Sequence, residues 1–179
     1  IAYASNVDIE SGVPADFATT AYFGNSKQIK NYFKTCFQAC NEIIDNLNTN
    51  WTSGELYFYI NQVINKYGLE GKTWSSTDND YNYGHTLPSL HSLIPHNSYI
   101  TNELTDNNAE AMRDSRLFLS ESSSWELSKT DQFTIEPQFT IPQNSQVPKA
   151  MIHCVVEVSS GKLKVCNCCE HLPRMLGLI

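Results

Sequence analysis

The sequence lacks long apolar runs and any excess of basic residues. No stretch approaches the about 18 consecutive apolar residues that a membrane-spanning helix needs. The opening segment, IAYASNVDIESG, lacks the basic region and apolar block of a signal peptide. The 12 Lys and Arg against 19 Asp and Glu give a net charge of −7, whereas nucleic acids and anionic lipids attract basic surfaces. We therefore expect neither a membrane nor a nucleic acid as a partner.

The sequence also lacks the motifs of hydrolases that use a serine or cysteine nucleophile, and a chain of this size does not require disulfides to fold. It contains no G-x-S-x-G motif, and none of its six cysteines stands in a recognisable nucleophile context. A domain of 179 residues is large enough to fold without disulfides, so reduced thiols and a cytoplasmic location are expected. Cys36 and Cys40, one helical turn apart, are expected in the core. Three alternatives remain open for the segment CNCCEH (166–171). Its cysteines and histidine could bind zinc together with His153 and Cys154, the cysteines could form disulfides, or they could stay free thiols.

Apolar periodicity predicts helices in the first half of the chain. The composition, 41% hydrophobic and 11% aromatic, is that of a folded domain rather than a disordered one. Apolar residues spaced three and four apart indicate helices over 26–48 and 52–67. The residues expected to mark the helix ends are Asn25 with Gln28, Thr52 with Glu55, and Gly68.

Strands are expected on both sides of these helices. Residues 1–23 read as two strands joined by a turn, and the pattern after Gly71 is strand and loop to the end, with a hairpin turn at 159–161. The order of strands, two helices and further strands lacks regular alternation. It predicts an α+β fold with a mostly antiparallel sheet.

Several polar residues in apolar surroundings are candidates for chemistry. A carboxylate in an apolar strand, as in FTIEP, needs a partner or a metal, because burial of an unpaired charge is costly. Carboxylates and imidazoles that converge from separate strands are typical of metal sites. The residues singled out are Asp8, Asp16, His85, His91, His96, Glu136 and His153.

Three segments, taken in order, resemble one known family. They are DFATTAYFG starting at Asp16, Tyr83-Gly84-His85, and LSKTDQFTIEPQFTIP over 127–142, of which FTIEP is the most specific. Together they resemble the pita-bread metallopeptidases, which include methionine aminopeptidases, Xaa-Pro aminopeptidases, prolidases and the metal-free creatinases. The ordered set runs over nearly the whole chain.

This resemblance implies a fold and a site. The fold would be a single pita-bread domain over 1–179, with a curved, mostly antiparallel sheet, helices on its convex face and the site on its concave face. The first helix pair of the family is missing from the chain, so a second chain or a homo-oligomer partner is expected to cover the sheet. The implied metal ligands are Asp16, His85 and Glu136, the implied substrate-side imidazole is His91 or His96, and the replacement ligands are Asp8 and His153.

The chain also departs from the family at two ligand positions. The first aspartate of the family falls near Ser5, and the last glutamate falls at Ile152 or His153, where no acid stands. A two-metal centre needs bridging carboxylates, so one divalent cation (Mn, Co, Zn or Fe), or none, is expected.

The function implied is a peptidase-like hydrolase that acts at the N-terminal end of peptides. Two alternatives remain open. One is a catalytically silent module that binds a peptide or protein partner, and the other is a metal-free, creatinase-type amidinohydrolase.

Overall fold

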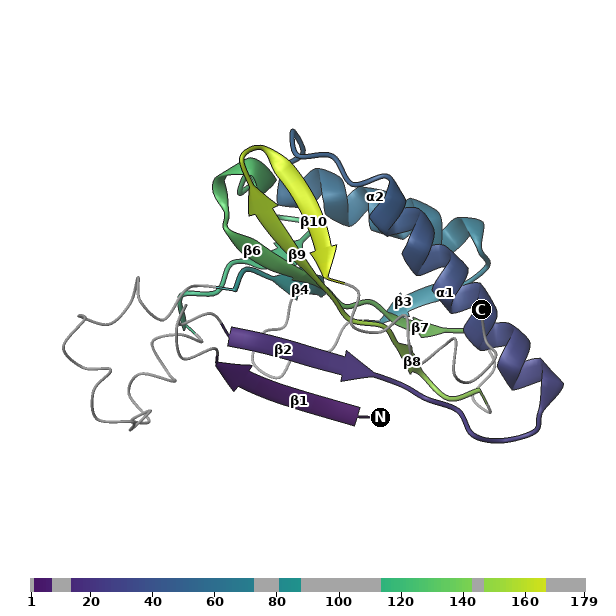
Figure 1. Cartoon of the computed structure of the whole chain (residues 1–179). Coiled ribbons are helices and arrows are strands. Elements are labelled where there is room, and N and C mark those ends of the chain that lie inside the picture. The colour runs from purple at the N-terminus through teal and green to yellow at the C-terminus, as the bar shows by residue number, and fades with distance from the viewer. Residues whose placement is uncertain (1, 8–13, 73–80, 88–113, 143–146, 167–179) are drawn as a thin grey trace.

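The computed structural model describes residues 2–7, 14–72, 81–87, 114–142 and 147–166 (Figure 1). The helices are α1 (Lys27–Asp45), α2 (Ser53–Lys66) and a short 3-10 helix at Leu127–Lys129. The strands are β1 (Ala2–Val7), β2 (Pro14–Thr19), β3 (Glu70–Lys72), β4 (Asn82–His85), β5 (Phe118–Ser120), β6 (Gln132–Ile135), β7 (Gln138–Thr140), β8 (Ala150–Met151), β9 (Cys154–Ser159) and β10 (Lys162–Cys166). Among the described residues, no helix is long and apolar enough to cross a bilayer.

Both predicted helices form, and local signals explain where they begin. The capping box of α2 is confirmed, because Thr52 Oγ1 accepts from the Glu55 N–H and Glu55 accepts from the Thr52 N–H. The capping box predicted at Asn25 and Gln28 is wrong. The N-cap of α1 is Ser26, whose hydroxyl oxygen accepts from the Ile29 N–H and takes the role assigned to Asn25.

The ends of the two helices differ from one another. After α2 the chain turns at Gly68, whose φ of +66° suits glycine, and the Leu69 N–H bonds back to the Ile64 carbonyl, so the predicted stop is confirmed. Helix α1 ends at Asp45, before the predicted residue 48, with Asn46 as its C-cap.

The strands pair only in antiparallel fashion within the described residues, as predicted. They form the ladders β1-β2, β10-β9-β6, β3-β7-β8 and β4-β5. Single bridges join these ladders, with Thr19 opposite Ile152 and Thr86 opposite Phe133. The predicted hairpin between β9 and β10 is confirmed, since Ser160 and Gly161 both have positive φ, as a two-residue turn requires.

One long ladder runs through β6–β7 and β8–β9, and it is interrupted in the middle. Ile135 lies opposite Cys154 on one side of the interruption, and Gln138 lies opposite Met151 on the other. The register is the same on both sides, so Glu136 lies opposite His153. Pro137, next to Glu136, has no N–H to donate, which explains why the regular pairing stops there.

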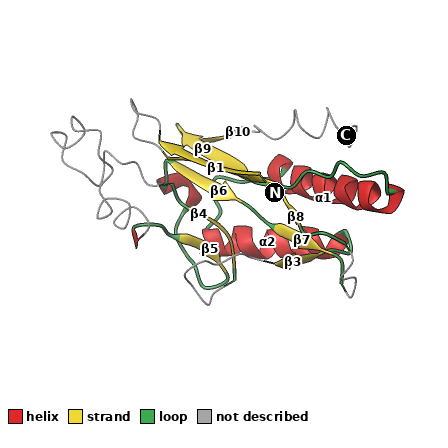
Figure 2. Cartoon of the chain, turned by 90° about the horizontal axis from the view of Figure 1, so that it is seen from below, coloured by secondary structure: helices red, strands yellow, loops and turns green. Residues whose placement is uncertain are grey.

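The apolar core lies between the helices and one face of this ladder. Phe133 and Ile135 of β6, with Cys154 and Val156 of β9, are buried in the same cluster as the inner faces of α1 and α2. Figure 1 shows the two helices together on one side of the strands, and Figure 2 shows the same layers from below. Because side chains alternate along a strand, Thr134 and Glu136 belong to the opposite face.

Candidate functional site

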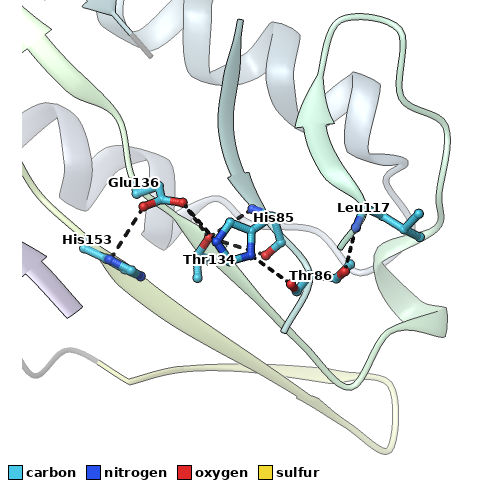
Figure 3. Close-up of polar contacts among 6 residues, drawn as sticks. All are labelled: His85, Thr86, Leu117, Thr134, Glu136 and His153. Carbon is cyan, nitrogen blue, oxygen red and sulfur yellow. Dashed lines mark hydrogen bonds and ion pairs between the residues drawn. The ribbon is translucent and has the colours of Figure 1, made fainter. Parts of the chain in front are cut away.

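The polar cluster on this opposite face centres on one carboxylate between two imidazoles (Figure 3). Glu136 Oε1 lies 3.6 Å from His85 Nε2, and Glu136 Oε2 lies 3.8 Å from His153 Nδ1. Both distances exceed that of a direct hydrogen bond. The side chain of Glu136 is 19% exposed, whereas those of His85 and His153 are 7% and 1% exposed. The carboxylate is therefore the part of the cluster that a small ligand can reach.

His85 reaches this cluster because β4 is irregular at Gly84. Tyr83 faces the helices, where its hydroxyl donates to Asn61 Oδ1 of α2 at 2.7 Å. His85, two residues later, meets Glu136 on the other face, and the β4–β5 register shifts between Asn82 and His85. Gly84 has φ +147°, and a Cβ there would lie 2.1 Å from the Thr134 carbonyl oxygen. Only glycine fits both this conformation and this contact.

The hydroxyl of Thr134 links His85 to Glu136. Its Oγ1 accepts from the His85 N–H at 3.0 Å and lies 3.1 Å from Glu136 Oε1. It also lies 3.4 Å from the His85 carbonyl oxygen. The hydroxyl has one proton, and donation to the closer, charged carboxylate gives the stronger bond. Thr134 thus fixes both the backbone that carries His85 and the carboxylate that faces it.

A backbone carbonyl orients the ring of His85. The ring Nδ1 lies 2.8 Å from the Thr86 carbonyl oxygen. A carbonyl only accepts, so Nδ1 carries hydrogen, and Nε2 is the nitrogen presented to Glu136. Thr86 is itself held by two bonds with Leu117, in which the Thr86 N–H donates at 2.9 Å and Thr86 Oγ1 accepts at 3.0 Å. Phe118 packs edge-on against the imidazole.

The structure brings together three of the seven predicted site residues: His85, Glu136 and His153. Asp16 lies on β2 opposite Ser5, and its side chain is outside the described part of the structure. Asp8, His91 and His96 lie outside the described residues. Sequence reasoning missed Thr134, although a polar residue two positions before Glu136 on the same strand had to share its face.

A metal centre needs more donors than these. Within the described residues, no group of three or more His, Cys, Asp and Glu side chains is arranged to hold a metal ion. The described side chains alone therefore do not fit the divalent cation that the resemblance implies.

A zinc site that combines His153 with Cys154 is ruled out. The Sγ of Cys154 lies 3.8 Å from Cys40 Sγ of α1 on the helix face, whereas His153 faces Glu136. Consecutive residues of a strand point to opposite faces. Cys36 and Cys40 are buried in the core, as predicted.

Solved structures of peptidases match this arrangement of elements. The Xaa-Pro dipeptidase from Bacillus anthracis matches with a TM-score of 0.54 and 17% identity, over 86% of this chain and 35% of that one. The prolidase from Pyrococcus furiosus matches with a TM-score of 0.52 and 18% identity, over 86% of this chain and 37% of that one. The X-Pro aminopeptidase from Thermotoga maritima matches with a TM-score of 0.54 and 13% identity, over 86% of this chain and 35% of that one. The chain has the pita-bread fold of these peptidases.

The likeness covers only part of each solved structure. The chain spans about a third of the length of these solved structures, 35% of the first. No protein-family model matches the sequence. No curated protein matches it either. The likeness therefore concerns the fold alone.

Proposed function

We propose that this chain is a peptidase-like hydrolase domain that acts at the N-terminal end of peptides, with Glu136 at the centre of its site. The observation that carries the proposal is the carboxylate between two imidazoles, at 3.6 and 3.8 Å, on a fold shared with Xaa-Pro peptidases. A single partly exposed carboxylate attracts the ammonium group of a peptide N-terminus. The prolidase-like fold favours an Xaa-Pro bond as the one tested first.

The proposed chemistry uses proton transfer at named atoms. A Glu136 oxygen accepts a proton from the water as the water adds to the scissile carbonyl. A protonated imidazole beside it gives a proton to the leaving amine as the C–N bond breaks, and the Glu136 carboxyl then returns its proton to that imidazole. The bond from Thr134 Oγ1 to Glu136 Oε1 holds the carboxylate in place, and the bond from His85 Nδ1 to Thr86 keeps Nε2 directed at it. Positioned general acid–base groups of this kind contribute about 10²- to 10⁴-fold to a rate.

The test is hydrolysis of Xaa-Pro dipeptides and longer Xaa-Pro peptides by the purified chain. Glu136→Gln is expected to lower the rate by at least about 100-fold. Glu157→Gln is the matched control, because Glu157 is an exposed β9 carboxylate whose partner is Lys164 at 3.3 Å. Equal activity of both variants, or none in the unmodified chain under every condition, would overturn the hydrolase proposal.

Added metal and chelator distinguish a metal-dependent mechanism from a metal-free one. If Mn, Co, Zn or Fe restores activity that chelator removes, then side chains beyond the described ones complete a cation site. If chelator leaves activity intact while Glu136→Gln removes it, the metal-free, creatinase-type mechanism is supported.

We propose that at most one cation binds per chain, because His153 stands where a second bridging acid is needed. Metal analysis of the purified chain checks this number.

A second candidate function is a silent module that binds peptides without cleaving them. The observation that favours it is His153, an imidazole where the resemblance predicts an acid, directly opposite Glu136 in the ladder. Calorimetric titration with uncleaved Xaa-Pro peptides tests it. Binding that Glu136→Gln weakens, together with no turnover, supports this function over the hydrolase.

A further inference from the structure

Two thiols meet on the helix face of the long ladder, directly behind the candidate site. Cys40 of α1 and Cys154 of β9 are 1% and 2% exposed, and their Sγ atoms lie 3.8 Å apart in a thiol–thiol hydrogen bond. They are 114 residues apart in sequence. Cys154 pairs with Ile135 in the ladder and immediately follows His153. The contact thus joins the helix layer to the strand that carries a site residue.

We propose that Cys40 and Cys154 form a redox-active dithiol, which a peroxide converts into a disulfide that ties α1 to β9. A disulfide has an S–S length of about 2.05 Å, so the sulfur atoms must approach by less than 2 Å, roughly the shift that side-chain rotation gives. Cys36, the third cysteine whose side chain the structure describes, makes no such contact with either of them. The inference is independent of the proposed hydrolase activity.

The chemistry balances with hydrogen peroxide as the oxidant. One thiolate attacks a peroxide oxygen, the O–O bond breaks, and a sulfenic acid forms with release of hydroxide, which takes up a proton as water. The second thiol then attacks the sulfenic sulfur, the S–S bond forms, and a second water leaves. Two thiols lose two electrons and two hydrogens in total, and one peroxide becomes two waters.

Burial slows the oxidation of these thiols, and the closeness of Cys40 and Cys154 makes it selective for the pair. The hydrogen bond to Cys40, together with burial, raises the pKa of the Cys154 thiol well above its usual range. Burial raises the pKa of Cys36 to about 12. Thiolate is the reactive form, so both sites react slowly. The pair differs from Cys36 in one respect: a sulfenic acid formed there already has a second thiol beside it.

The first experiment uses the full chain without substitution. After exposure to hydrogen peroxide, alkylation and digestion, mass spectrometry is expected to find a peptide pair linked through Cys40 and Cys154, with a loss of two hydrogens. Cys36, buried one turn earlier on the same helix face, is the internal control and is expected to remain alkylated as a thiol. Dithiothreitol is expected to restore both thiols.

A second experiment removes competing thiols. In a variant with Cys36→Ala, Cys166→Ser, Cys168→Ser and Cys169→Ser, thiol labelling of the denatured protein is expected to find no free thiol after peroxide and two after reduction. The cross-link is expected to raise Tm by on the order of 10 °C, since it closes a loop of more than 100 residues. Two free thiols after peroxide, oxidation of both to sulfonic acids, or a link through Cys36 would each overturn the proposal.

Discussion

The helix layer and the polar cluster on the opposite face of the ladder are stabilised by different means. In the layer, α1 and α2 contribute many apolar side chains of similar burial, such as Phe33, Ile43 and Leu56. In the cluster, three chain segments contribute His85, Glu136 and His153, and a single hydroxyl, that of Thr134, links His85 to Glu136. The layer therefore depends on side-chain volume, whereas the cluster depends on individual hydrogen bonds and one backbone conformation.

The largest effect is expected where volume is removed from the layer. Phe33 of α1 is 1% exposed and packs against Tyr22 and Tyr32. Phe33→Ala is expected to lower the free energy of unfolding by about 3 to 5 kcal/mol, from lost burial and the remaining cavity. Phe58→Ala on α2, where the ring is 52% exposed, is the matched control and is expected to change it by about 0.5 kcal/mol or less. Urea denaturation measures both, and similar losses would contradict the description of the layer.

The next effect is expected at the backbone of the cluster. Gly84→Ala places a Cβ 2.1 Å from the Thr134 carbonyl oxygen at a φ of +147°. The strand must move, so we expect a loss of about 2 to 4 kcal/mol and a displaced His85. Gly161 also has a positive φ, +72°, which lies in the left-handed helical region, and Gly161→Ala places nothing within 4 Å of the added atom. It is expected to lose only about 1 to 2 kcal/mol, and equal losses would show that conformation alone, not the contact with β6, matters at Gly84.

A smaller effect is expected from removal of one hydroxyl. Thr134→Val keeps the shape of the side chain but leaves the buried His85 N–H without its acceptor and Glu136 without its donor. The expected loss is about 1 to 3 kcal/mol, and the amide signal of His85 is expected to shift in NMR spectra. Thr134→Ser keeps the hydroxyl, so the amide chemical shift of His85 is expected to stay close to that of the unmodified chain. Equal shifts in both variants would mean that the methyl group, not the hydrogen bond, positions His85.

The helix layer was predictable from the sequence because its signals are local. Apolar spacing located α1 and α2, and the Thr52–Glu55 pair located a helix start to the residue. The start of α1 was misplaced by one residue because Asn25 and Ser26 are both good N-caps. Which of them caps depends on the direction from which the chain enters, and that direction is set by tertiary packing.

The cluster was only partly predictable because its geometry is not local. FTIEP and Gly84-His85 pointed to the correct segments, and His85, Glu136 and His153 do meet. The pairing of Glu136 with His153 depends on a register that continues across the break at Pro137. The alternation of apolar residues fixes which face each side chain lies on, but it does not identify the partner residue on a strand that is distant in the sequence. Alternation along the same segment puts His153 and Cys154 on opposite faces, whereas the sequence alone had left a zinc site with both residues open.

The smallest effect is expected at the start of α2, where the layer depends on hydrogen bonds as the cluster does. Thr52→Ala removes the acceptor for the Glu55 N–H and is expected to cost about 1 kcal/mol. Thr35→Ala, on the exposed side of α1, is the control and is expected to change stability by less than half as much, since its hydroxyl only bonds back to Asn31 within the helix.

The capping box also makes this helix start sensitive to pH. The Thr52 N–H and hydroxyl donate to Glu55 and lower the pKa of its carboxyl from its ordinary value. A lowered folded-state pKa gives stability that is present at neutral pH and is lost as the pH falls through that pKa. The difference in free energy of unfolding between the unmodified chain and Glu55→Gln, whose amide does not ionise, is therefore expected to be constant from pH 8 to 6 and to shrink below about pH 4.5. Urea midpoints across this range measure the difference, and a gap that stays constant down to pH 3 would show that the carboxylate adds nothing to the cap.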